Sequence, residues 1–182
     1  MSIISDRFII YACPTGDLNE QIEEYFERAI KLCGKNKAHQ YMPHCTLTGF
    51  FTDELSSVPF YLEALDKAYT EAKSNETSLD ITITKLTFNK NWHGLELQAD
   101  GIKQLIANFA LLEKSLTRQE QLRLKDWLHL SLAYGFNLQD SEQLKHLATE
   151  LIKIQTDVNW ELRFYQKNPD RTWKCWQSWS IK

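Results

Sequence analysis

The chain has 182 residues, of which 43% are apolar and 25% are charged, and this balance is typical of one globular domain with a real core. The chain has 21 Lys and Arg residues and 24 Asp and Glu residues, which gives a net charge of −3. This charge argues against a protein that binds duplex nucleic acid mainly through the phosphates of the duplex. The scattered cysteines show no metal-ligand spacing, and neither a signal peptide nor a long apolar run is recognisable, so we expect a cytoplasmic monomer that does not associate with membranes.

Apolar residues at period two or period 3.6 predict alternating strands and helices through the first half of the chain. Asp17 is expected to cap the first helix, with Glu20 completing a capping box, and Gly34 is expected to end it. The predicted order is a strand at 7–13, a helix from Asp17, a strand at 41–51, a helix from Ser57 and a strand at 79–88.

The same order then starts again. The second half is predicted to hold a strand at 94–99, a helix from Asp100, a strand at 127–136, a helix that Asp140 caps, and strands at 158–165 and 172–181. This repeat predicts a single α+β domain over residues 1–182, built from sequence halves of about 1–90 and 91–182. We expect a bilobal fold, in which two lobes of antiparallel sheet are related by a pseudo-twofold axis, with helices outside and a central cleft.

The middle strand of each half carries a histidine followed two residues later by a hydroxyl side chain. The two copies are His44–Thr46 (HCT) and His129–Ser131 (HLS), about half the chain length apart. Because side chains alternate along a strand, each histidine shares one face with its hydroxyl partner, about 7 Å away. One such pair is common in structural strands, but two pairs at equivalent places in a repeated order indicate a site.

Paired imidazoles and hydroxyls suit the hydrolysis of a phosphodiester. One imidazole can take a proton from water while the other protonates the leaving oxygen, since both titrate near neutral pH. The hydroxyls of Thr46 and Ser131 can donate to the non-bridging oxygens, and this chemistry requires no metal or other cofactor. The remaining histidines are expected to be solvated: His39, His93 and His146.

With these motifs the sequence resembles the 2H phosphoesterase superfamily, which is defined by two H-x-T/S-x motifs. Pro43–Leu47 and His129–Tyr134 match its cyclic phosphodiesterase branch in motif and context, and Tyr11–Pro14 looks like the family's first strand. The resemblance spans nearly the whole chain, although only the two motifs are specific. It implies RNA-processing chemistry, namely the metal-independent opening of a 2′,3′-cyclic nucleotide or of ADP-ribose 1″,2″-cyclic phosphate.

The resemblance also implies a role for each motif residue. His129 would activate water and His44 would act as the acid. Thr46 and Ser131 would bind the phosphate.

Three aromatic residues are candidate substrate contacts: Tyr11, Trp92 and Tyr134. Trp92 stands beside a predicted turn and is the candidate for stacking on a base. Strict alternation places Tyr134 on the face opposite His129, so that it reaches substrate only if the strand ends or bulges near Gly135. A core tyrosine fits the spacing equally well.

The nature of the substrate stays open in the sequence, because no Lys or Arg closely flanks either motif. Candidate cations that the sequence cannot place include Arg118, Arg123, Lys167 and Arg171. We expect a small nucleotide or an RNA-terminal cyclic phosphate as the partner. One alternative is an enzyme of the 2′-5′ RNA ligase-like branch, and another is a non-catalytic nucleotide-binding module.

Overall fold

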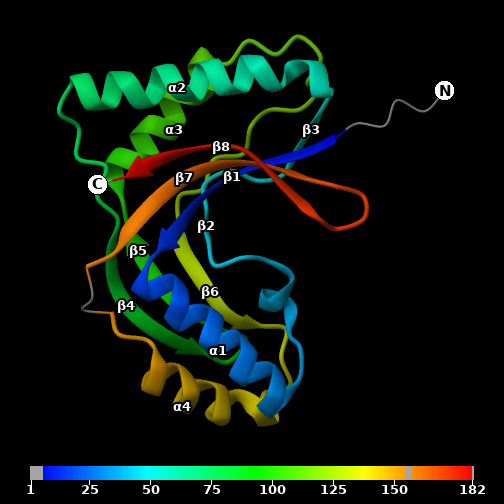
Figure 1. Cartoon of the computed structure of the whole chain (residues 1–182), viewed down its shortest axis with the longest axis vertical. Helices are drawn as coiled ribbons and strands as arrows, with labels where there is room; N and C mark the ends of the chain where they lie inside the picture. The colour runs from blue at the N-terminus through cyan, green and yellow to red at the C-terminus, as the bar shows by residue number, and fades with distance from the viewer. Residues whose placement is uncertain (1–5, 155–156, 182) are drawn as a thin grey trace.

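The computed structural model describes residues 6–154 and 157–181. The prediction that the N-terminal segment is not a signal peptide falls mostly outside the described residues. The described chain is an α+β fold with an antiparallel eight-stranded sheet and four α-helices (Figure 1). The strands are β1 (Asp6–Thr15), β2 (Cys45–Thr46), β3 (Phe51–Asp53), β4 (Thr82–Asn89), β5 (Trp92–Gln98), β6 (Leu128–Tyr134), β7 (Asn159–Lys167) and β8 (Trp173–Ile181). The helices are α1 (Asp17–Cys33), α2 (Val58–Ser74), α3 (Asp100–Leu112) and α4 (Ser141–Leu151).

The sheet interleaves the two halves of the sequence. Its strand order is β4-β5-β6-β2-β1-β7-β8, and β3 pairs with β1 outside this path. The helices pair across the halves as well, since α1 packs against α4 at one end of the molecule and α2 packs against α3 at the other (Figure 1). The strands that carry the two histidine motifs, β2 and β6, are therefore neighbours, with Cys45 opposite Leu130.

Strand β1 lies near the middle of the sheet and is buried on both faces. Phe8, Ile10 and Ala12 belong to the main core with the helices, whereas Ile9 and Tyr11 belong to a smaller apolar cluster on the other face. Because side chains alternate along a strand, the smaller cluster marks the face that carries the functional side chains.

The predicted strand at residues 41–51 is wrong in extent, because strand β2 begins only at Cys45 and ends after Thr46. Thr48 forms an isolated bridge with Leu124, and its hydroxyl accepts a hydrogen bond from the backbone N–H of Ile10 at 3.1 Å. Pairing resumes at β3. Between β2 and β3, the Thr48 hydroxyl takes the N–H of Ile10, while the Ile10 carbonyl still accepts from the Leu47 N–H at 3.0 Å.

The predicted helix caps are also corrected. Gly16, with φ of 65°, precedes α1 as its N-cap, and Asp17 is already the first helical residue. Asp140 does stand at the N-cap of α4, but its side chain makes no capping hydrogen bond.

Of the histidines expected to be solvated, His146 is exposed, His39 is half-buried and His93 is only 1% exposed. The prediction for His93 is wrong because the turn between β4 and β5 is confined to residues 90–91, which leaves His93 inside β5. Its ring packs edge-on against Phe88, and its Nε2 lies 3.2 Å from the Ser141 hydroxyl.

Every helix of the described ranges is too short or too polar to cross a lipid bilayer.

Candidate active site

A cavity of about 430 Å³ brings the two histidine motifs together. Thr46 enters it from β2 and His44 from the residue directly before this strand, and His129 and Ser131 enter it from the adjacent strand β6. Trp92 and Tyr134 also line it. Residues that the sequence reasoning did not single out complete the lining: Phe26, Ala38, Tyr41, Met42, Asn89 and Trp127.

Each histidine is oriented by the carbonyl of the residue two positions earlier. The Nδ1 atom of His44 lies 2.7 Å from the Met42 carbonyl oxygen, and the Nδ1 atom of His129 lies 3.4 Å from that of Trp127. Since a carbonyl only accepts, Nδ1 carries the proton in the neutral ring and Nε2 keeps its lone pair. Met42 and Trp127 each lie two residues before a histidine but outside the strands, so strand alternation alone does not identify their carbonyl contacts.

Burial favours the neutral form of both imidazoles. Burial, together with repulsion from the protonated form of His129, lowers the pKa of His44 to about 4 against the opposing effect of the Met42 carbonyl. Burial likewise lowers the pKa of His129, where the Trp127 carbonyl opposes the shift. A phosphate anion between the rings would raise both pKa values, because it stabilises the imidazolium forms.

Aromatic rings hold His129 and Ser131. The His129 ring stacks on Trp127 at 3.9 Å between centroids and meets Trp92 edge-on at 5.3 Å. The indole Nε1–H of Trp92 donates to the Ser131 hydroxyl oxygen at 2.9 Å. This bond occupies an acceptor site of Ser131 and leaves its O–H free to donate to a phosphate oxygen. Trp92 thus contacts His129 and Ser131 of the second motif and also lines the cavity.

His44 packs between two tyrosine rings. The centroids lie 4.0 Å from Tyr11 and 5.4 Å from Tyr41. Tyr11 is only 1% exposed and Tyr41 lines the cavity. The burial of Tyr11 favours a role in supporting the imidazole of His44 over the predicted contact with substrate.

Tyr134 reaches the cavity through a β-bulge. His93 pairs with Ala133 but Gly94 pairs with Ser131, so Leu132 is an extra residue in β6. Leu132 and Ala133 are both fully buried in the main core. The side chain of Tyr134 therefore returns to the face of Ser131, as the sequence reasoning required of a bulge. The bulge lies at Leu132, and the strand ends at Tyr134, directly before Gly135.

The cations that the sequence could not place lie outside this cavity. Arg118 pairs with Glu113, and Arg123 donates to the Phe50 carbonyl at 3.0 Å. Lys167 and Arg171 line a separate hollow. Over the described ranges, no three His, Cys, Asp or Glu side chains are grouped as metal ligands.

No family model matches the chain. It is similar to the ecdysteroid-phosphate phosphatase of Bombyx mori, with 31% identity over 170 residues that cover 90% of this chain and 25% of the relative. It is also similar to the ubiquitin-associated and SH3 domain-containing protein B of Homo sapiens, with 30% identity over 165 residues that cover 89% of this chain and 25% of the relative. The chain thus spans about a quarter of the length of the curated relatives it matches.

Proposed function

We propose that the chain is a 2H-type cyclic phosphodiesterase, which hydrolyses a cyclic phosphodiester on a small nucleotide without a metal ion or other cofactor. The carrying observation is that two imidazoles and two hydroxyls, from His44, Thr46, His129 and Ser131, line one cavity. The substrates that fit are a 2′,3′-cyclic nucleotide, free or at the end of RNA, and ADP-ribose 1″,2″-cyclic phosphate. We also propose that the fold consists of two lobes related by a pseudo-twofold axis, as expected from the sequence.

In this mechanism the two histidines divide the proton transfers. The free Nε2 of His129 takes a proton from water, whose oxygen attacks the phosphorus. The bond from phosphorus to one sugar oxygen breaks, and protonated His44 gives that oxygen its proton, leaving a phosphomonoester. The phosphate anion raises the pKa of His44 on binding and so favours the acid form. Thr46 and Ser131 donate to the non-bridging oxygens.

Similarity to longer proteins supports phosphoester chemistry in general terms. Relatives from two insects, Bombyx mori and Drosophila melanogaster, are named ecdysteroid-phosphate phosphatase. Because the chain spans only about a quarter of each, these names support a phosphate-ester substrate but do not locate the named activity in the matched part.

The proposal is tested by hydrolysis of 2′,3′-cyclic AMP in excess EDTA, with separation of the products. His44→Ala and His129→Ala are each expected to abolish turnover. Thr46→Ala and Ser131→Ala should lower it by about 10- to 1000-fold, as for the loss of one donor to a developing charge. His146→Ala, an exposed position on α4, is the matched control. Unchanged activity in either motif-histidine variant would contradict the mechanism.

Binding of nucleotides without turnover at any pH would favour the non-catalytic module instead. Turnover of 2′-5′ linkages in preference to cyclic phosphates would favour the 2′-5′ RNA ligase-like branch.

A further inference from the structure

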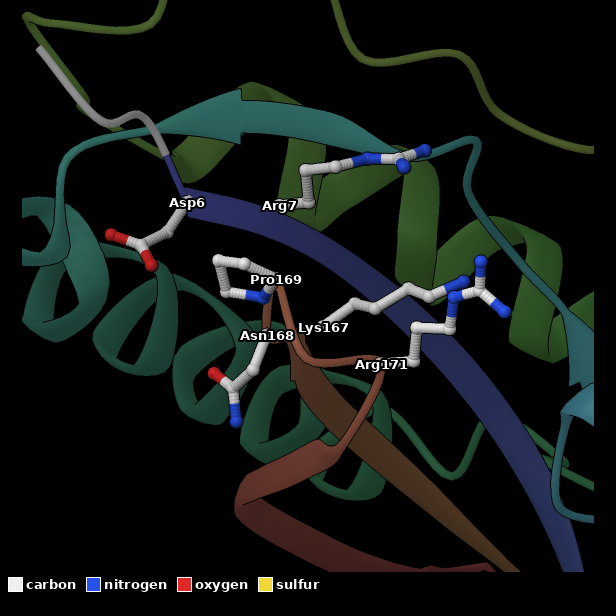
Figure 2. Close-up of a pocket in the computed structure, with 6 residues that line it drawn as sticks. All are labelled: Asp6, Arg7, Lys167, Asn168, Pro169 and Arg171. Carbon is white, nitrogen blue, oxygen red and sulfur yellow. The ribbon is translucent and has the colours of Figure 1, made fainter. Parts of the chain in front are cut away.

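Three cations gather in a second hollow, of about 360 Å³, where the start of β1 meets the turn between β7 and β8. Arg7, Lys167 and Arg171 extend toward the same side of this hollow, while the carboxylate of Asp6 points to the other side (Figure 2). The three cations come from segments about 160 residues apart in the chain. Only the pairing of Arg7 with Lys167 across β1 and β7 brings them together.

The carboxylates near these cations, those of Asp6 and Asp170, bond to other groups. Within residues 6–154 and 157–181, none of the three forms an ion pair. The nearby Asp6 accepts a hydrogen bond from Gln166 at 2.7 Å, and Asp170 accepts bonds from Thr172 within the turn. Burial lowers the pKa of Lys167, and the charges of Arg7 and Arg171 lower it further. The three cations therefore repel one another, and the binding of an anion between them would reduce this repulsion.

One aromatic ring connects this cationic cluster with the candidate active site. The Lys167 Nζ lies 5.2 Å from the ring centroid of Tyr41. The same Nζ lies 5.3 Å from the ring centroid of Trp173 and 5.6 Å from that of Phe50. Tyr41 contacts His44 and lines the catalytic cavity. Tyr41 thus contacts both His44 and Lys167, and it is the ring that the cavity and the cations share.

The positive surface continues beyond the cluster. Arg171 also lines an adjoining hollow of about 390 Å³ with Lys35 and Lys37. The short 3₁₀ helix that carries Lys37 (Lys37–Gln40) packs against β6, the strand that carries His129 and Ser131. Cations interleaved with aromatic rings are typical of sites for single-stranded nucleic acid, where phosphates meet the cations and bases stack on the rings.

We propose that Arg7, Lys167 and Arg171 bind a second phosphate of the substrate, so that the preferred substrate is a short single-stranded oligonucleotide with a terminal cyclic phosphate. This inference rests on the proposed function. The second phosphate is the internucleotide phosphate next to the one held between the histidines. The pyrophosphate of an ADP-ribose derivative offers similar chemistry and is distinguished by the test below.

The kinetic test compares kcat/KM for three substrates: 2′,3′-cyclic AMP, the dinucleotide ApA with a 2′,3′-cyclic phosphate end, and ADP-ribose 1″,2″-cyclic phosphate. The wild type should prefer the dinucleotide. Lys167→Ala should lower kcat/KM for the dinucleotide about 10-fold, as expected for one charge-assisted contact, and leave that for cyclic AMP within about twofold. Lys67→Ala, an exposed cation on α2, is the control and should change neither.

An equal loss on cyclic AMP and the dinucleotide, or no loss on either, would overturn the inference. A loss confined to ADP-ribose 1″,2″-cyclic phosphate would overturn the oligonucleotide assignment.

A binding test separates this inference from the proposed function. Calorimetry would measure the affinity of ApA with a 3′-phosphate end and of adenosine 3′-monophosphate, neither of which needs turnover. Arg171→Gly is the second variant, because Arg171 has φ of 70°, where glycine is unstrained, so the fold should be kept. We expect about 10-fold weaker binding of the dinucleotide alone. Unchanged dinucleotide affinity in both variants would refute the cation site, whether or not the wild type is an enzyme.

Discussion

The buried imidazole of His44 makes the stability of the protein depend on pH. Its pKa is about 4 in the folded chain, whereas an unfolded histidine titrates near 6.5. Between these values the unfolded chain holds more protons, so the free energy of unfolding should fall as pH falls from about 6.5 to about 4. The contribution of His44 approaches about 3 kcal/mol.

Urea unfolding at pH 7.5 and pH 4.5 measures this loss. His44→Asn, which can keep a donor to the Met42 carbonyl, should lose less stability between the two pH values than the wild type. Equal losses in both proteins would contradict the assignment to His44.

The hydrogen bond from Trp92 to Ser131 makes a second prediction at the residue scale. Trp92→Phe keeps a ring beside His129 but removes the indole N–H that orients the Ser131 hydroxyl. One neutral hydrogen bond contributes about 0.5–1.5 kcal/mol, so kcat/KM for 2′,3′-cyclic AMP should fall about 2- to 10-fold. Ser131→Ala should cost more, since it removes the phosphate donor itself. A Trp92→Phe variant with wild-type kcat/KM would show that this bond does not orient Ser131.

At the scale of elements, strand β5 approaches β6 closely because Gly94 has no side chain. A Cβ atom at this position would lie 2.3 Å from the Leu130 carbonyl oxygen and 2.4 Å from Cζ2 of Trp92. The strand backbone cannot yield easily, so Gly94→Ala should lower the free energy of unfolding by about 1–3 kcal/mol and displace the indole.

Urea unfolding and tryptophan fluorescence measure both effects of Gly94→Ala. The matched control is Gly49→Ala, whose Cβ atom would meet only the flexible end of Arg123, at 3.0 Å. Equal losses of stability in the two variants would contradict the close approach of β5 to β6.

At the scale of the whole molecule, the interleaved sheet predicts one cooperative unit. Strand β1 of the first half pairs with β7 of the second from Arg7 opposite Lys167 to Thr15 opposite Asn159, and α1 packs against α4. Neither half can bury its apolar faces alone. We expect fragments 1–90 and 91–182 to remain unfolded when expressed separately, as measured by circular dichroism.

The full chain should unfold in urea in a single transition, with coincident curves from tryptophan fluorescence and far-ultraviolet circular dichroism. A folded fragment, or two separate transitions, would show that the halves are independent domains.

The sequence by itself determined the order of the main elements and the identity of the two motifs. Apolar periodicity is a local property, so it identified α1–α4 and the long strands within a few residues. Alternation also placed each motif histidine on the face of its hydroxyl partner, because a two-residue spacing in a strand needs no tertiary information.

Only the tertiary structure decided the features that depend on distant partners. The predicted strand at 41–51 is cut short where the Thr48 hydroxyl takes the N–H of Ile10, and Tyr134 enters the cavity because Leu132 bulges out of its pairing with β5. The cationic cluster exists because β1 pairs with β7. Local sequence preferences do not encode which strands become neighbours, since pairing is determined by long-range burial of the whole sheet.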